Sequence, residues 1–198
     1  MVCSESLIGN IMENFNTYCK EVDLSLCYDL LISKGVLQTY KKGDYLISTH
    51  QCCNFIGLVK SGYFKYSVSG TDGEEHITGF AFQNSIVGDY FSLIKDQMPL
   101  TNIIATTDSE VFLCNKDVLK EFLVNNPIQH LNISNALFYQ VYTQFLDLHR
   151  LSPQERYLSI LAKCPDILQT ITLKEMASFL NITPTHLSRL RKEITFNK

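Results

Sequence analysis

The spacing of hydrophobic residues divides the chain into three regions. Apolar residues recur every three or four positions over residues 4–34, which predicts helical structure, and Gly35 follows as glycine often follows a helix. Residues 36–115 instead contain short runs rich in Val, Ile, Phe, Tyr and Thr, separated by turn signals. Helical spacing returns after Asn115. The pattern therefore predicts an α+β protein in which helices flank a strand-rich region.

The turn signals of the middle region favour a small roll, barrel or sandwich. Turns are expected at residues 42–44, at 61–62 and within 69–75, where two glycines suit a tight hairpin. We expect strands in both "SIVGDYFSLI" (85–94) and "NIIATTDSEVFLCN" (102–115). Many short strands at such spacing are typical of closed or double-layered β architectures.

A regular stripe of apolar and aromatic residues runs along the predicted helix of residues 127–150. Its positions follow coiled-coil steps of three and four residues if Asn135 and His149 are included. A second apolar stripe contains Leu137, Val141 and Leu148. A helix with two apolar faces has two surfaces to bury, so we expect one to pack on its own domain and the other on a second copy. The alternative is an amphipathic helix that packs only on its own domain. The expected dimer contact consists of Ile128, Leu131, Asn135, Phe138, Tyr142 and Phe145.

The last part of the chain has the pattern of two short helices joined by a sharp turn. Thr172 and Glu175 have capping-box spacing, and Asn181 suits a left-handed turn residue. Thr183 followed by Pro184 suits the start of a second helix. This is the pattern of a helix-turn-helix, whose second helix enters the major groove of DNA. The alternative is a pair of packed helices with a solvated basic face.

Charge is distributed unevenly along the chain, whose formal net charge is −3. Residues 1–162 carry 11 Lys and Arg against 17 Asp and Glu, whereas residues 163–198 carry 6 against 3. A basic tail on an acidic body can serve phosphate contact. No apolar run reaches the ~18 residues that a membrane span needs, and the N-terminus lacks the pattern of a signal peptide. We therefore expect a cytoplasmic protein without a membrane partner.

The cysteines and histidines do not form a recognisable chemical site. The seven cysteines are irregularly spaced and include no paired C-x-x-C motifs, so no metal site is expected. Most should be buried thiols. The adjacent Cys52 and Cys53 are either a redox-active pair or neighbours by chance. The chain contains no nucleophile elbow and no phosphate-binding glycine loop. We therefore do not expect an enzyme.

The motifs together resemble the Crp/Fnr family of transcription regulators. "ITLKEMASFLNITPTHLSRLRKE" (171–193) resembles the family's DNA-binding end, in particular the form seen in Bacteroidetes, where "LSRLRK" is a typical ending of the recognition helix. "FIGLVKSGYFKYSV" and "GEEHITGFAFQNSIVGDY" are similar to the family's cyclic-nucleotide-binding β-roll. The resemblance covers nearly the whole chain. It implies a double-stranded β-helix or jelly roll with N-terminal helices in residues 1–126, a dimerisation helix in 127–150, and a short, winged-helix-like helix-turn-helix in 151–198.

The resemblance also implies a function and partners. It implies a dimeric, sequence-specific regulator that binds an inverted repeat in double-stranded DNA, with RNA polymerase as a further partner. Family positions that match Pro184, Thr185 and Arg189 face base edges, and those that match Thr183 and His186 approach the backbone. The expected DNA contacts are Thr183, Pro184, Thr185, His186, Ser188, Arg189, Arg191 and Lys192. The alternative is a small-molecule-binding or protein-interaction module of the same fold whose terminal helices only pack.

The family's phosphate cassette is incomplete in this chain. The cassette pairs a Gly-Glu turn with a later Arg-Ser or Arg-Thr, and the corresponding residues here are Gly88-Asp89 and Pro99-Leu100. No arginine occurs between residues 1 and 149, and the nearby Lys95 lacks the planar fork that clamps a phosphate. We therefore do not expect cAMP, and we name no cofactor. An unknown small-molecule effector is expected in a pocket that contains Gly88, Asp89, Tyr90, Leu100 and Thr101.

Overall fold

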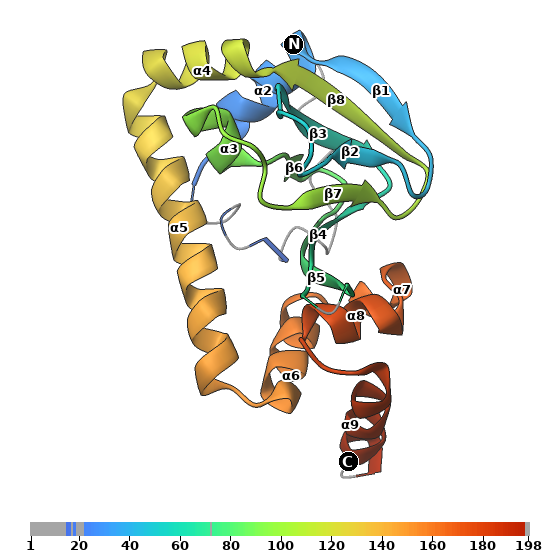
Figure 1. Ribbon diagram of the computed structural model, residues 1–198. Helices are drawn as coiled ribbons and strands as arrows, with labels where there is room; N and C mark the ends of the chain where they lie inside the picture. Colours follow the sequence, from blue (N-terminus) through green and yellow to red (C-terminus); the bar gives the residue numbers. More distant parts are fainter. Residues whose placement is uncertain (1–14, 17, 19–21, 72, 197–198) are drawn as a thin grey trace.

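Two four-stranded antiparallel sheets form the strand-rich region, as the turn pattern predicts. The computed structural model describes residues 15–16, 18, 22–71 and 73–196 (Figure 1). The sheet orders are β1-β8-β3-β6 and β2-β7-β4-β5. The strands are β1 Val36–Tyr40, β2 Tyr45–Ile47, β3 Phe55–Ser61, β4 Phe64–Ser69, β5 Glu75–Ala81, β6 Ile86–Val87, β7 Asn102–Ala105 and β8 Ser109–Asn115.

The hydrophobic core of the roll lies between the two sheets. Val59 and Val111 come from one sheet and Phe64 and Ile103 from the other, and all four are fully buried. The strands that supply them are rich in β-branched and aromatic residues, which fill such an interior without polar atoms. The expectation of a double-stranded roll is confirmed.

Glycines with positive φ form the turns that the sequence predicts. Gly43, with φ 94°, lies where the chain crosses from one sheet to the other between β1 and β2. Gly62, with φ 77°, lies between β3 and β4, and an added Cβ there would come 2.1 Å from Ser109 Oγ. The hairpin between β4 and β5 is closed by the Gly70 N–H, which donates to the Glu74 carbonyl over 2.8 Å. These turns fix the strand order that follows.

The helices surround the roll and continue away from it. In Figure 1 the long α5 descends beside the roll, and α6 to α9 lie beyond the lower end of β5. The helices are α2 Ser25–Lys34, α3 Tyr90–Lys95, α4 Lys116–Asn125, α5 Pro127–Arg150, α6 Pro153–Lys163, α7 Ile167–Thr170, α8 Leu173–Phe179 and α9 Pro184–Phe196.

Three expectations about local structure are wrong. The helical structure expected over residues 4–34 is found over 25–34 and at Tyr18, but residues 15–16 and 22–24 are not helical. The rest of that range lies outside the described residues. The strand expected over 85–94 is two residues of β6 followed by α3, since Asp89 caps a helix there. The described residues after α5, which we call the terminal unit (151–196), contain no strand, so the expected wing is not found there.

The terminal helical unit shares a hydrophobic core with the roll. Tyr63, Phe80 and Phe82 of the roll pack in one cluster with Met176 and Leu180 of the terminal unit. Two hydrogen bonds cross the same boundary: the Ile77 N–H donates to Ser178 Oγ over 2.9 Å, and the Tyr63 hydroxyl donates to Glu175 Oε2 over 3.4 Å. The two units are therefore docked against each other rather than joined by the chain alone.

Candidate functional site

The turn of the terminal unit has the geometry that its sequence predicts. Asn181 has φ 55°, in the left-handed region, and its N–H donates to the Ser178 carbonyl over 2.9 Å. The hydroxyl of Thr183 accepts from the His186 N–H over 3.2 Å, so it satisfies one of the free amides at the start of α9. Pro184 is the first residue of that helix. The chain therefore turns within the four residues 180–183 and begins α9 at a fixed position.

α9 buries one face and exposes the other. Leu187 and Leu190 are 1% and 7% exposed and hold the helix against α8 and the shared core. Arg189 Nε lies 3.8 Å from Glu193 Oε1, but exposed pairs of this kind contribute little, so the guanidinium stays available for another contact. Among the predicted DNA contacts, Thr183, Pro184, Thr185, Ser188, Arg189 and Lys192 are exposed, whereas His186 and Arg191 are half-buried.

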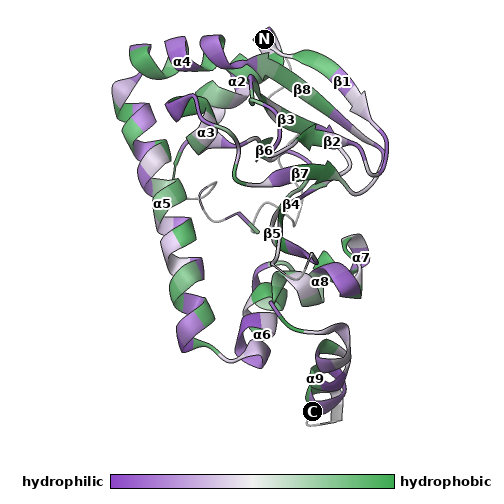
Figure 2. Ribbon diagram, in the orientation of Figure 1, coloured by the Kyte–Doolittle hydropathy of each residue, from purple (hydrophilic) through white to green (hydrophobic). Residues whose placement is uncertain are grey.

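α5 exposes the stripe that the sequence assigns to a dimer contact. Ile128, Leu131 and Phe138 are 76%, 60% and 69% exposed, and Tyr142 and Phe145 about half. Asn135 lies on the same exposed face, and Figure 2 shows hydrophobic positions recurring along the helix. The second stripe is only partly covered: Leu137 is half-buried, whereas Val141 and Leu148 stay exposed.

The residues of the expected effector pocket do not form one pocket. Asp89 uses both carboxylate oxygens within the chain: Oδ1 accepts from the Ser92 N–H over 3.0 Å and Oδ2 from the Leu100 N–H over 3.3 Å. The Leu100 side chain is 74% exposed, and Thr101 follows it outside the cavity beside α5. Gly88 and Tyr90 do line that cavity. The corresponding part of the family's cassette is therefore occupied by contacts within this chain.

A tyrosine that the sequence analysis did not identify covers the turn at Gly88. The hydroxyl of Tyr66 accepts from the Gly88 N–H over 3.3 Å and donates to the Gly88 carbonyl over 3.4 Å. Burial raises the pKa of Tyr66 to about 12 and that of Cys27, which lines the same cavity, to about 11. Both groups are therefore neutral at pH 7. An aromatic residue facing inward from β4 was the available signal, but alternation alone does not reveal what a buried hydroxyl contacts.

The cavity beside α5 has a volume of about 250 Å³. Tyr66, Thr78 and Gly79 line it from the roll, and Leu137 and Gln144 from α5. The cavity is mostly apolar, which is usual for a ligand site.

A second cavity, of about 410 Å³, lies between the end of α5, β5, α6 and α8. Arg156 lines it and donates from Nη1 to the Leu151 carbonyl over 2.8 Å and from Nη2 to the Leu180 carbonyl over 3.0 Å. The guanidinium thus ties the start of the terminal unit to the end of α8.

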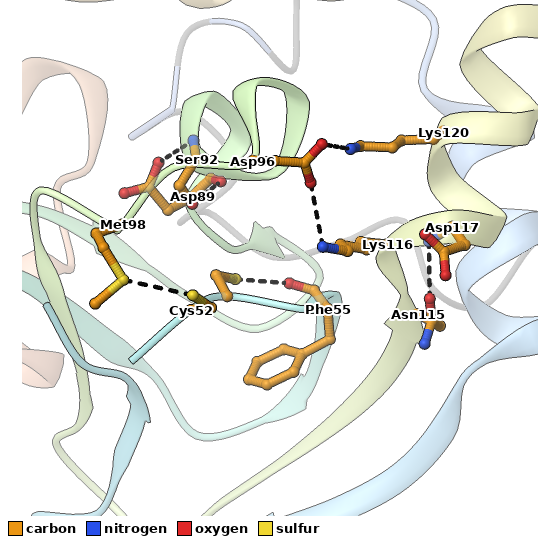
Figure 3. A network of polar contacts seen from close by, with 11 residues as sticks. Cys52, Phe55, Asp89, Ser92, Asp96, Met98, Asn115, Lys116, Asp117 and Lys120 are labelled. Atoms are coloured by element: carbon orange, nitrogen blue, oxygen red, sulfur yellow. Dashed lines mark hydrogen bonds and ion pairs between the residues drawn. The ribbon is translucent and has the colours of Figure 1, made fainter. Parts of the chain in front are cut away.

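A group of charged residues joins α3 to α4 (Figure 3). Asp96, the residue after α3, accepts from Lys120 Nζ over 2.6 Å and from Lys116 Nζ over 3.1 Å. Hydrogen bonds from Lys120 and then Lys116 hold the pKa of Asp96 below its ordinary value of 3.8. All three side chains are near the surface, so the group positions α3 without being buried.

The adjacent cysteines are free thiols in different environments. Cys52 is exposed, with its sulfur 3.5 Å from Met98 Sδ, as Figure 3 shows. Cys53 is buried and donates to the Phe55 carbonyl over 3.2 Å. Among the described residues, no group of three or more His, Cys, Asp and Glu side chains is arranged to hold a metal ion.

Comparison with known proteins assigns the fold. Residues 37–126 match the family model of the cyclic nucleotide-binding domain. No curated protein matches the chain in sequence. No helix in the described part of the chain has the length and apolar character of a membrane span.

Solved structures of bacterial regulators resemble nearly the whole chain. FixK2 from Bradyrhizobium japonicum is 14% identical, with a TM-score of 0.71 over 82% of this chain and 85% of that one. CooA from Carboxydothermus hydrogenoformans is 17% identical, with a TM-score of 0.65 over 95% and 85%. The c-di-GMP-responsive global regulator CLP from Xanthomonas campestris is 13% identical, with a TM-score of 0.64 over 86% and 91%. This chain therefore has the fold of Crp-like regulators: a cyclic-nucleotide-binding-type β-roll followed by C-terminal helices.

Proposed function

We propose that this chain is a dimeric, sequence-specific DNA-binding transcription regulator whose roll responds to an effector other than cAMP. The observation that carries the proposal is the exposed face of α9. Its arginine and hydroxyl side chains are free to reach base edges, while its leucines anchor the helix. Regulators with the same fold support it. A regulator of this kind catalyses no reaction.

The exposed stripe of α5 supports the dimer. A second copy packed on that stripe would bury its aromatic residues and present two α9 helices, roughly 34 Å apart, to an inverted repeat. The effector would act through α5, which lines both cavities and also carries the stripe. We further propose a cytoplasmic location, RNA polymerase as a partner, and the Bacteroidetes form of the family, on the resemblance of the recognition helix.

The experiment begins by selecting an operator from random double-stranded DNA with the full chain. Fluorescence anisotropy then measures the dissociation constant of the selected DNA over a salt series. Arg189→Ala should cost about 1–3 kcal/mol, roughly a 5- to 150-fold weakening, on the selected sequence, because a bidentate base contact is lost. Lys34→Ala removes an exposed charge from α2 and should leave the dissociation constant unchanged.

Salt dependence separates the two candidate functions. A protein that contacts several phosphates must bind more weakly as salt rises, because bound counterions are released from the DNA. Absence of DNA binding at low salt would reject the proposal. It would leave the alternative of a ligand-binding or protein-interaction module whose terminal helices pack on the roll.

A further inference from the structure

Among the described residues, the cavity between the roll and α5 is lined without any charged side chain. These lining residues are apolar, aromatic or neutral polar. The Cys27 thiol and the Tyr66 hydroxyl in this lining have pKa values raised by burial to about 11 and about 12, so both are neutral at pH 7. The described wall offers a phosphate or carboxylate no cation partner, and burying such an anion unpaired carries a large desolvation cost. The wall therefore selects against anions.

The polar groups of the cavity suit neutral ligand groups. Gln140 and Gln144 reach it from α5 and Thr78 from β5. Gln140 Oε1 already accepts from the Tyr18 N–H over 3.1 Å, whereas the Gln144 amide makes no hydrogen bond to the described residues. An amide offers both a donor and an acceptor, so it can pair with a hydroxyl, carbonyl or amide without requiring charge.

We propose that this cavity binds a small, uncharged and mainly apolar molecule that places a neutral polar group against Gln144. Its volume of about 250 Å³ lies just below the ~300–1,000 Å³ typical of sites for drug-sized ligands, so the molecule is small. That this molecule is the effector rests on the proposed function. That the cavity binds such a molecule depends on the cavity alone.

Such a ligand would contact the face of α5 next to the exposed stripe. Leu137 and Gln144 face the cavity, while Phe138 and Phe145 are immediate neighbours in sequence that face solvent. A ligand that changes the seating of α5 on the roll therefore changes the surface offered to a second copy. The same helix carries both contacts, so binding and dimerisation are coupled thermodynamically.

Isothermal titration calorimetry on the full chain tests the ligand class with a matched pair of probes. 1-Naphthalenemethanol and 1-naphthoate share one ring system and differ in charge at pH 7.5. The alcohol should bind with one site per chain, and both the carboxylate and cAMP should bind at least tenfold more weakly. Equal or tighter binding of either anion would overturn the inference, and so would the absence of alcohol binding.

Two variants locate the site. Gly79→Leu fills the cavity, and the backbone accepts it, because the nearest atoms to an added Cβ are Tyr66 side-chain atoms at 3.7–4.0 Å, an ordinary van der Waals distance. It should weaken alcohol binding at least tenfold. Thr78→Lys places an ammonium on an exposed position of the wall and should tighten 1-naphthoate binding at least tenfold over the parent chain.

The controls separate this inference from the proposed function. Tyr45→Ser, on β2 and outside the described lining of both cavities, should leave alcohol binding unchanged. If Gly79→Leu binds the alcohol normally, the probe occupies another surface and the inference is wrong. Calorimetry does not depend on DNA, so probe binding by a chain that binds no operator would reject only the regulatory role, and the reverse result would reject only the ligand class.

Discussion

Replacing Phe138 by serine should weaken dimerisation more than any change of similar size elsewhere on the surface. Phe138 lies midway along the exposed stripe of α5, and its ring stacks on that of Tyr142 with centroids 5.8 Å apart and planes 8° apart. In a symmetric dimer each copy contributes the same residue to the contact, so one substitution removes two aromatic rings from the interface.

The magnitude follows from the exposed area. Phe138 is 69% exposed. Aromatic side chains bury ~150–250 Å² in full, so about 140 Å² remains available per copy. At ~25 cal/mol per Å² this is about 3.5 kcal/mol for each ring as an upper bound. The freedom of motion lost on association reduces this gain. We therefore expect the substitution to destabilise the dimer by about 2–4 kcal/mol. The dissociation constant should therefore rise roughly 30- to 700-fold.

Sedimentation velocity across a concentration series measures this constant directly. Tyr45→Ser is the matched control: Tyr45 is an aromatic residue of similar exposure, 57%, on β2 at the far side of the roll from α5 (Figure 1). It should leave the constant unchanged. The reasoning is refuted if the parent chain is monomeric at all concentrations, or if both substitutions have the same effect.

Three further predictions concern stability and are measured by urea unfolding. Gly62→Ala should cost about 2–4 kcal/mol, since it combines a strained φ with a clash, whereas Gly43→Ala, with equally positive φ but open space, should cost about 1 kcal/mol. The pKa of Asp96 is lowered by the lysines of α4, so its carboxylate stabilises the fold above pH 3.8 and loses this effect as pH falls through the lower folded pKa. Asp96→Asn should thus lower the urea midpoint at neutral pH but not at about pH 2. Ser178→Ala should cost about 1–3 kcal/mol, because it leaves the Ile77 N–H without its partner; an unchanged midpoint would contradict the docked arrangement.

The terminal unit could be predicted well because its signals are local. Thr172 and Glu175 form the expected capping box, and Asn181 has the expected left-handed conformation. Each of these features depends on residues only a few positions apart, so the sequence contains everything that determines it. The stripe of α5 is similar, because the helical period alone decides which residues share a face.

The effector region could be predicted less well because its contacts are distant in sequence. The apolar run of residues 85–94 predicts a strand, but Asp89 caps a short helix there by accepting from the Ser92 N–H. Periodicity alone does not distinguish a short helix from a strand. Tyr66 and Gly88 are far apart along the chain, and their contact depends on how β4 packs against the turn. Leu100 is expected in the pocket because it aligns with a residue of the family's phosphate cassette. Alignment does not reveal that its side chain points to solvent.

The aromatic core shared by the roll and the terminal unit has a consequence for how the protein is made. Phe80 of β5 and Phe179 of α8 lie with ring centroids 5.7 Å apart, although about half the chain separates them in sequence. During synthesis the roll emerges first, and its outer aromatic residues stay uncovered until the last helices arrive. If translation stalled or ended early, the truncated chain would therefore expose these aromatic residues and be prone to aggregation. The final helices thus complete the burial of aromatic residues in the roll, which is made before them.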